Sequence, residues 1–458
     1  MDIFTSTVQQ NKTPKAIYFA TVIASLSGLF FGYDLAVISG AILFIKKQFL
    51  LSPTLEELVA SSSLVGGLIG ALLGGTLADI FGRKKVLILI TLISTLGSIG
   101  SALATNIIWI IIGRAIGGIA MGMISVTMTL YISEISPAKS RGLLVTISTF
   151  AITFGILISY IVDYAFSKSG SWQWMFGLAA TPAVVQGFCM FFLPESPRWL
   201  VKKGLIEKAR SVLIYFRGTK SIDDELNMIK ESVVKQTAKW SDLLGPNLRK
   251  PLIIGILLAI FRSLSGFSIV MAYAPTIFQL AGVKSTSVDL MATVGLGVVF
   301  NAVTILEIWL IDRVGRRPLL LIGLFIMGIS LAIMGFVFYL PNRSEILGFI
   351  AVFCLFIYSI FYSIGPGSVI FLMISEIYPL NLRGLAMSVA MAFLWAVYII
   401  TTVTFLTLIQ YLGTAETFWL YTLFCVASWL FSYFLIPETK GRSLEEIERE
   451  WHRKGTIS

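Results

Sequence analysis

The chain has 458 residues, of which 56% are hydrophobic and 13% are charged, and its formal net charge is +10. A soluble domain carries about 25% charged residues, so this composition excludes an ordinary soluble globular protein. A surplus of Lys and Arg in a soluble protein would suggest a nucleic-acid partner. Here the basic residues gather between hydrophobic runs, so we expect a lipid bilayer around the chain and no nucleic acid.

Twelve hydrophobic segments follow one another, each long enough to cross a hydrocarbon core of about 30 Å as a helix. We expect spans at 16–44, 59–79, 84–104, 107–132, 142–165, 172–193, 251–280, 287–311, 317–340, 346–374, 384–411 and 416–436. The first segment is too long and too internal for a cleaved signal peptide. The sequence therefore predicts an all-α membrane protein with twelve transmembrane helices.

Basic residues mark the connections that follow every second span. Arg83, Lys139 and Arg316 lie in such connections, and the segments 194–250 and 437–458 are also rich in Lys and Arg. The positive-inside rule places these regions in the cytoplasm, together with both termini. The compact loops suggest the cell membrane of a bacterium, that is, its inner membrane.

Several site types are excluded by residue content. Cys189, Cys354 and Cys425 all fall inside predicted spans, and the only histidine is His452 in the C-terminal tail. No metal spacing, disulfide framework, nucleophile–base pair or phosphate loop is present. We therefore expect no metal, no cofactor and no enzymatic activity, and any proton carrier in the membrane must be a carboxylate.

The chain contains an internal repeat with a period of roughly half its length. SEISPAKSRG at 133–142 matches SEIYPLNLRG at 375–384, GTLADIFGRKK at 75–85 matches WLIDRVGRRPL at 309–319, and PESPR at 194–198 is answered by PETKG at 437–441. Each copy occupies the same place in its half. A duplicated six-span unit with both copies in one orientation places a solute site at midmembrane between the halves.

The repeat divides the chain into four parts. We expect a six-helix bundle at 1–193, a cytoplasmic linker at 194–250, a second six-helix bundle at 251–436, and a cytoplasmic tail at 437–458. The linker is expected to contain short helices near 205–216 and 222–235. The two bundles are parallel repeats, and we expect a monomer.

Acidic residues accompany the basic residues at the cytoplasmic span ends. One interpretation is a gate made of ion pairs, and the other is topology combined with helix capping. The candidate gate residues are Asp79, Arg83, Glu134, Arg141, Glu195, Asp312, Arg316, Glu376, Arg383 and Glu438.

These motifs, together with FGYDLAVISG at 31–40, resemble the sugar-porter family of the major facilitator superfamily. The joint order of the motifs covers about 28–441 and is most similar to bacterial proton-coupled sugar symporters. The resemblance implies the major facilitator fold, sugar transport by alternating access, and a cytoplasmic charge network that closes the inner gate in the outward-open state. Ile80 departs from the pattern, because the family usually has Arg there.

Two charges lie deep in the first half. By helix rise, Asp34 is about 27 Å from the inner end of its span and Arg114 about 10 Å from the outer end, so the two are able to pair. The pair is either a static brace or a proton switch in which protonation of Asp34 releases Arg114. By resemblance, proton symporters carry Asp and Arg at these positions and mammalian glucose facilitators carry Asn at the first, which favours symport over uniport.

The expected solute site departs from the family. Its Gln-Gln and Asn in span seven are replaced by Arg262, Ser263 and Ser268. Arg262 suits a carboxylate; the alternatives are an internal pair with Asp34 or Glu307, each roughly 10 Å away in depth, or a water-filled site.

Other candidate solute contacts are Phe31, Thr149, Asn301, Trp395 and Gly365, which lies in a Gly-Pro-Gly break of span ten. Thr149 replaces a family Gln, Asn301 lies beside a replaced Asn, and Trp395 is retained. We expect a sugar, a polyol or a sugar acid, moved with protons. A uniporter, a carrier of acidic solutes and a non-transporting nutrient sensor stay as alternatives.

Overall fold

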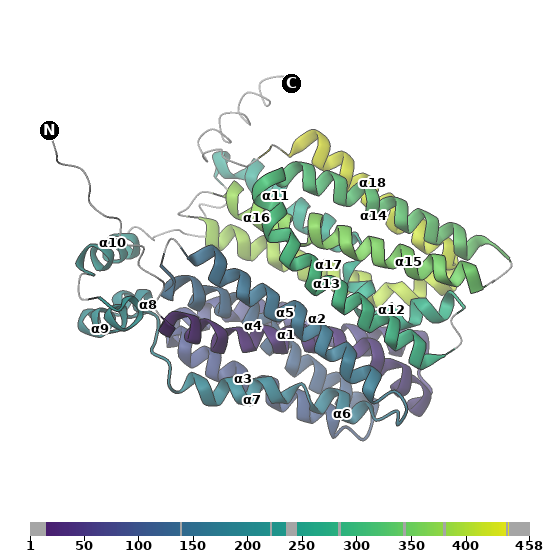
Figure 1. Ribbon diagram of the computed structural model, residues 1–458, viewed down its shortest axis with the longest axis horizontal. Coiled ribbons are helices and arrows are strands. Elements are labelled where there is room, and N and C mark those ends of the chain that lie inside the picture. The colour runs from purple at the N-terminus through teal and green to yellow at the C-terminus, as the bar shows by residue number, and fades with distance from the viewer. Residues whose placement is uncertain are drawn as a thin grey trace.

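The computed structural model describes residues 15–137, 140–219, 222–234, 245–282, 285–341, 345–378, 382–436 and 438. Within these ranges every regular element is helical. Figure 1 shows two helical bundles side by side, with the first half of the chain in purple to blue and the second in green to yellow. Three short helices, α8, α9 and α10, lie beyond one end of the bundles.

The first bundle follows the predicted spans closely. Its helices are α1 (Lys15–Phe49), α2 (Pro53–Phe81), α3 (Arg83–Ala102), α4 (Ile107–Ile135), α5 (Arg141–Ala165), α6 (Trp172–Gly177) and α7 (Ala180–Met190). The sixth predicted span, 172–193, is thus two helices with a break between them. Helices α2 and α4, α1 and α5, and α3 and α4 make the most extensive contacts in this half.

The linker helices are α8 (Pro197–Lys202), α9 (Ile206–Arg217) and α10 (Asp223–Val234). The latter two agree with the helices expected near 205–216 and 222–235. Their apolar sides form a small separate core that includes Leu200, Leu213 and Leu226. We call the end of the bundles beside these helices the linker end, and the opposite end the far end (Figure 1).

The second bundle repeats this arrangement with two interrupted spans. Its elements are α11 (Pro246–Leu264), α12 (Phe267–Leu280), α13 (Thr286–Val314), α14 (Arg316–Tyr339), α15 (Glu345–Tyr362), the π-helix η2 (Ser363–Gly367), α16 (Ser368–Ile377), α17 (Arg383–Leu412) and α18 (Thr414–Leu435). The expected break at Gly-Pro-Gly is the π-helix, since Pro366 has no N–H to donate. The break between α11 and α12 falls at Gly266, whose φ of +98° is a conformation that favours glycine.

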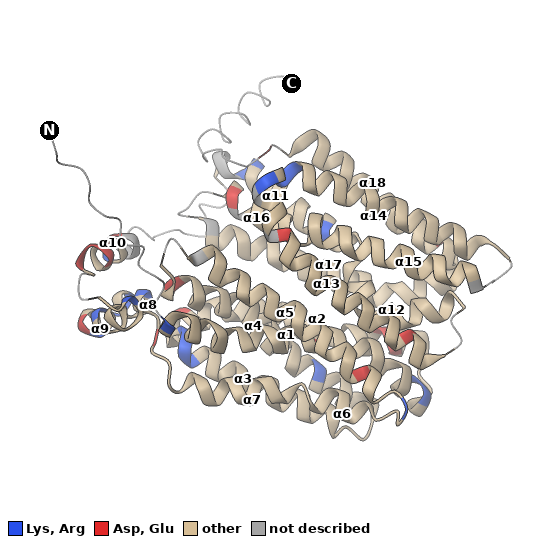
Figure 2. Ribbon diagram, viewed as in Figure 1, with Lys and Arg blue, Asp and Glu red and all other residues tan. Residues whose placement is uncertain are grey.

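Eleven helices within the described ranges are long and apolar enough to cross a membrane, when α11–α12 and α15–α16 each count as one span. The split sixth span accounts for the difference from the twelve segments that the sequence predicts. Charged residues gather mostly at the two ends of the bundles and around the linker helices (Figure 2). A chain with this charge distribution fits a bilayer with its apolar middle in the hydrocarbon core.

Glycines let α2 and α4 approach closely, and this contact gives a first prediction. A Cβ at Gly118 would lie 2.0 Å from the carbonyl oxygen of Ser63, a backbone atom that cannot turn aside. We expect Gly118→Leu to lower the free energy of unfolding by at least about 3 kcal/mol, the upper end of overpacking costs. Thermal unfolding of the purified protein in detergent measures the effect.

Gly142 supplies the matched control, because a Cβ there would meet nothing within 4 Å. Gly142→Leu on α5 is expected to leave the melting temperature unchanged or slightly raised, since Leu favours helix more than Gly. Equal melting temperatures for the two variants would contradict the close packing of α2 against α4.

Candidate functional site

Asp34 on α1 and Arg114 on α4 are both buried in the first half, with 5% and 1% exposed. Arg114 Nε donates to the carbonyl of Val59 at 3.2 Å, and its Nη2 donates to Ser63 Oγ at 2.7 Å. Within the described residues, Asp34 Oδ2 and Arg114 Nη1 have no hydrogen-bond partner. The two charges form no ion pair within 4.0 Å, so the direct pair that their similar depths allow is not made in this conformation.

Arg262 on α11 lies in a box of aromatic rings in the second half. Its guanidinium carbon lies 4.3 Å from the ring centre of Phe371 and between 5.6 and 6.0 Å from those of Phe267, Tyr362 and Tyr398. Nε donates to the carbonyl of Gly367 at 3.1 Å, and Nη1 donates to the Tyr398 hydroxyl at 2.5 Å. Arg262 therefore ties α11 to the break before α16 and to α17.

Two predicted solute contacts are occupied by bonds within the second half. Ser263 Oγ bonds the carbonyls of Ala259 and Leu394, at 3.1 and 3.0 Å. Ser268 Oγ shares a hydrogen bond of 2.9 Å with Thr401 Oγ1. In this conformation both hydroxyls act in helix packing.

Three other predicted contacts lie where the two halves meet. Phe31 on α1 packs edge-on against Trp395 on α17, with ring centres 6.3 Å apart. Asn301 Nδ2 on α13 donates to the carbonyl of Thr153 on α5 at 2.8 Å. The structure thus brings Phe31, Trp395 and Asn301 to the boundary between the bundles.

Gly365 and Thr149 lie elsewhere. A Cβ at Gly365 would meet Gly323 and the carbonyl of Leu319 at 3.0 Å, so this glycine faces α14. Thr149 is exposed on α5 and makes none of the contacts around Arg262. Their expected role as solute contacts has no geometric support here.

At the linker end of the first half, Arg83 connects three helices. Its guanidinium pairs with Asp79 at 3.0 Å and with Glu134 at 2.9 Å, and it bonds the carbonyl of Ala78 at 3.1 Å. Asp79 also pairs with Lys202 on α8 at 2.9 Å. This part of the candidate gate therefore joins α2, α3 and α4 to the linker.

The side chain of Glu195, which lies in the connection between α7 and α8, accepts hydrogen bonds at the N-terminus of α3. Both of its carboxylate oxygens accept from the backbone N–H of Lys84, at 3.1 and 3.2 Å. Burial raises the pKa of the Glu195 carboxyl, and the N–H donors of Ser196 and Lys84 oppose that rise. Gly82 has φ of +102°, and a Cβ there would collide with Glu195, so the motif requires glycine.

The second half repeats this geometry. Arg316 pairs with Glu376 at 3.3 Å, and Glu438 accepts from the backbone N–H groups of Arg316 and Arg317 at 3.1 Å each. Gly315 has φ of +107°, matching Gly82. The side chains of the other predicted gate residues, Arg141, Asp312 and Arg383, lie outside the described part of the structure.

One described contact between the halves lies at the far end. There, Thr407 on α17 donates its backbone N–H and its hydroxyl to the Glu57 carboxylate on α2, both at 2.6 Å. Glu56 pairs with Lys46 at 2.7 Å. Sequence reasoning missed this site, although two consecutive acids at the start of a span are an available signal. At the linker end, the ion pairs of Arg83 with Asp79 and Glu134 and of Arg316 with Glu376 each lie within one half, and the pair of Lys202 with Asp79 joins the first half to the linker.

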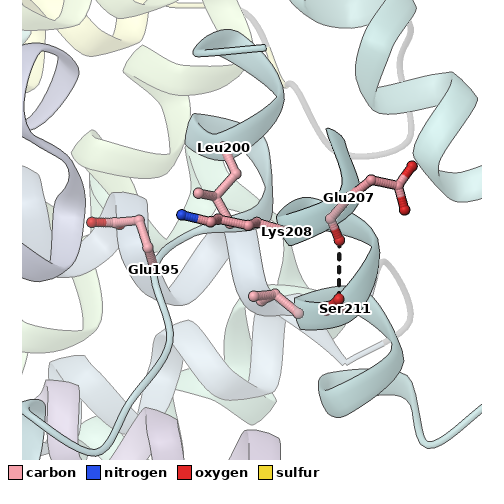
Figure 3. Close-up of a pocket in the computed structure, with 6 residues that line it drawn as sticks. Glu195, Leu200, Glu207, Lys208 and Ser211 are labelled. Atoms are coloured by element: carbon pink, nitrogen blue, oxygen red, sulfur yellow. Dashed lines mark hydrogen bonds between the residues drawn. The ribbon is translucent and has the colours of Figure 1, made fainter. Parts of the chain in front are cut away.

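A groove of about 380 Å³ lies beside the linker helices and is lined by Glu195, Leu200, Glu207, Lys208, Ser211 and Val212 (Figure 3). In this view Lys208 extends toward Glu195, and Ser211 Oγ bonds the Glu207 carbonyl on α9 at 3.0 Å. The groove is outside both bundles, so it is separate from the boundary where Phe31, Asn301 and Trp395 meet.

The sequence is similar to that of a known protein family and of individual transporters. The model of the family described as "Sugar (and other) transporter" matches residues 20–451. The galactose-proton symporter of Escherichia coli is 36% identical over 444 residues, covering 96% of each chain. The D-xylose transporter of Levilactobacillus brevis is 39% identical over 433 residues, covering 94% of each chain.

Solved structures of transporters also match the fold of this chain. The inward open conformation of the E. coli xylose transporter matches with a TM-score of 0.83 at 30% identity, covering 95% of this chain and all of that one. The major facilitator superfamily proton:xylose symporter bound to 6-bromo-6-deoxy-D-glucose matches with a TM-score of 0.79 at 31% identity, covering 96% of this chain. The expected twelve-helix fold is thereby confirmed, and this chain belongs to the sugar transporter family of the major facilitator superfamily.

Proposed function

We propose that the protein is a secondary active transporter that moves a sugar together with a proton by alternating access. The carrying observation is the buried Asp34 carboxylate beside Arg114, which is a membrane acid without a direct ion pair. Such an acid usually marks an ion or proton pathway. The names of relatives such as the galactose-proton and arabinose-proton symporters support this reading.

In this proposal Asp34 binds the proton, and the solute lies between the halves near Phe31, Trp395 and Asn301. The linker end, both termini and segments 194–250 and 437–458 face the cytoplasm of a bacterial cell, and 1–193 and 251–436 move as two bundles. The chain acts as a monomer. The far-end contacts, together with the match to an inward open structure, support an inward-facing conformation.

The acid–base clusters around Arg83 and Arg316 act as the cytoplasmic gate in this scheme. In the present conformation Arg83 pairs with Glu134 and Arg316 pairs with Glu376, each within its own half. Closing the cytoplasmic side would bring the two clusters together, and ion pairs between them would then hold the outward-facing state.

A second candidate function is a carrier of an acid-bearing solute. Its support is the buried guanidinium of Arg262, because such a group grips a carboxylate well. The alternative to proton-coupled transport is a uniporter, in which the solute moves down its own concentration gradient.

Transport by the purified protein in liposomes tests the proposal. We expect one neutral sugar from a panel of galactose, arabinose, xylose and polyols to accumulate above its external concentration when the inside is one pH unit more alkaline. For coupling of one proton per sugar the limit is about tenfold, because one pH unit corresponds to about 1.4 kcal/mol. Equilibration that ignores the gradient would leave a facilitator, and accumulation of sugar acids alone would favour the second candidate.

A further inference from the structure

Arg262 on α11 and Tyr398 on α17 are bonded to each other inside the second half, with 7% and 6% of their surfaces exposed. Nη1 of Arg262 donates to the Tyr398 hydroxyl at 2.5 Å, and Nε donates to the carbonyl of Gly367 at 3.1 Å. The guanidinium carbon also lies 4.3 Å from the ring centre of Phe371 and 5.9 Å from that of Tyr398. Because the faces of aromatic rings attract a cation, neutral groups of the second half stabilise this buried charge.

A series of contacts leads from the boundary between the halves to Arg262. Phe31 of the first half packs edge-on against Trp395, with ring centres 6.3 Å apart. Trp395 packs edge-on against Tyr398, also with ring centres 6.3 Å apart, and Tyr398 accepts the hydrogen bond from Arg262. Tyr398 is therefore the residue through which Arg262 is connected to the proposed solute region.

The two hydrogen bonds of Arg262 limit how a carboxylate is able to bind it. A carboxylate grips a guanidinium most strongly through two parallel N–H groups, which come either from Nε and Nη2 or from Nη1 and Nη2. Gly367 accepts from Nε and Tyr398 accepts from Nη1, so each of these pairs contains a nitrogen that is already bonded. Gly367 uses its backbone carbonyl, whereas the bond to the Tyr398 hydroxyl can be removed by a side-chain substitution.

We propose that Tyr398 is a positioning residue that keeps Arg262 from gripping the solute, so that the site selects neutral sugars and polyols over sugar acids. To gain a two-pronged grip at Nη1 and Nη2, a sugar acid has to displace the Tyr398 hydroxyl, and the loss of that bond offsets much of the gain. A neutral sugar requires no such rearrangement. This inference rests on the proposed transport function and decides between its two solute classes.

Binding of matched neutral and acidic sugars to the purified protein tests the inference. The probes are D-galactose with D-galacturonate and D-glucose with D-glucuronate, measured by calorimetry and by uptake into liposomes. The unmodified protein is expected to bind the neutral member of a pair more tightly. Tyr398→Phe keeps the ring beside Arg262 but removes the hydroxyl, which frees Nη1 for a carboxylate. The ratio of acid to neutral affinity should then rise at least about tenfold, which corresponds to about 1.4 kcal/mol.

Tyr362→Phe is the matched control among the same rings. The ring centre of Tyr362 lies 5.6 Å from the guanidinium carbon of Arg262, and its hydroxyl lies 3.4 Å from that of Tyr398. This variant leaves the bond between Arg262 and Tyr398 in place, so the ratio of acid to neutral affinity should stay unchanged. Arg262→Gln combined with Tyr398→Phe should cancel the gain in acid affinity, because that gain requires the guanidinium.

If Tyr398→Phe fails to fold, Arg262→Gln alone decides. Removing a guanidinium that does not grip the solute should change the ratio of acid to neutral affinity by less than about threefold, whereas removing a ligand of a carboxylate should lower it at least about tenfold.

The inference is overturned if the unmodified protein prefers the acid, or if Tyr398→Phe binds both members in the original ratio. It is also overturned if Tyr362→Phe raises the ratio as much as Tyr398→Phe does. Failure of the proposed function looks different. In that case the unmodified protein neither binds nor transports any sugar of the panel, neutral or acidic.

Discussion

Replacing Asp34 by asparagine is expected to abolish sugar accumulation driven by a proton gradient. Exchange of sugar across the membrane should be retained. The amide keeps the shape of the side chain but binds no proton at physiological pH. The transport cycle then carries sugar without its coupled ion, so a gradient of one pH unit no longer yields the accumulation of up to about tenfold expected for one proton per sugar. Uptake into liposomes with and without the gradient, together with counterflow of labelled sugar, measures both activities.

The matched control for Asp34 is Asp163, another buried acid of the first half, on α5 beside Gly40 of α1. Asp163→Asn should retain gradient-driven accumulation. If Asp34→Asn still accumulates sugar as the unmodified protein does, then Asp34 is a structural brace and the proton is bound elsewhere. A loss of both accumulation and counterflow would indicate damage to the fold, which thermal unfolding would reveal.

Removing the Glu57 carboxylate is expected to open the far end. Glu57 accepts two hydrogen bonds from Thr407 across the boundary between α2 and α17, each at 2.6 Å. Hydrogen bonds to a charged group contribute about 1.5–3 kcal/mol each. Losing two therefore moves the equilibrium between inward- and outward-facing states by at least about a hundredfold toward the outward-facing one, provided that the bonds break on opening.

Distances between spin labels measure this shift. Leu50 at the end of α1 and Tyr411 near the end of α17 are 87% and 80% exposed at the far end, and they belong to different halves. With the native cysteines replaced, labels at these two positions should move apart in Glu57→Ala. Glu416→Ala removes an acid from the same end within one half, and should keep the original distances. Superimposable distributions for Glu57→Ala and the unmodified protein would show that these bonds do not hold the far end closed.

Much of the fold was predictable from local sequence. Long hydrophobic segments predict membrane-spanning helices, because backbone groups in lipid must form hydrogen bonds within their own helix. The repeated motifs predicted that acidic and basic residues at the span ends on one side of the membrane can form ion pairs, and the structure shows Arg83 with Glu134 and Arg316 with Glu376. Helical spacing also located α9 and α10 outside the bundles.

Which side chains meet in the expected solute region could not be predicted from the sequence, because it depends on tertiary structure. Rise along a helix gives the depth of a residue but not which neighbour its side chain meets. The similar depths of Asp34 and Arg114 allow a direct pair, but in the structure Asp34 Oδ2 and Arg114 Nη1 have no hydrogen-bond partner. For the same reason the sequence did not reveal that Thr401 bonds Ser268, or that Arg262 lies among four aromatic rings.

The sequence by itself determined the membrane class, the duplicated architecture, the family resemblance and the charged motifs, because each is carried by local composition or by residues close in the chain. Only the tertiary structure decided which residues of the two halves meet and which charges face one another. Glu57 and Thr407 are 350 residues apart, and nothing in local periodicity links them. Their contact arises from the packing of α2 against α17, which depends on the shapes of both helices at once.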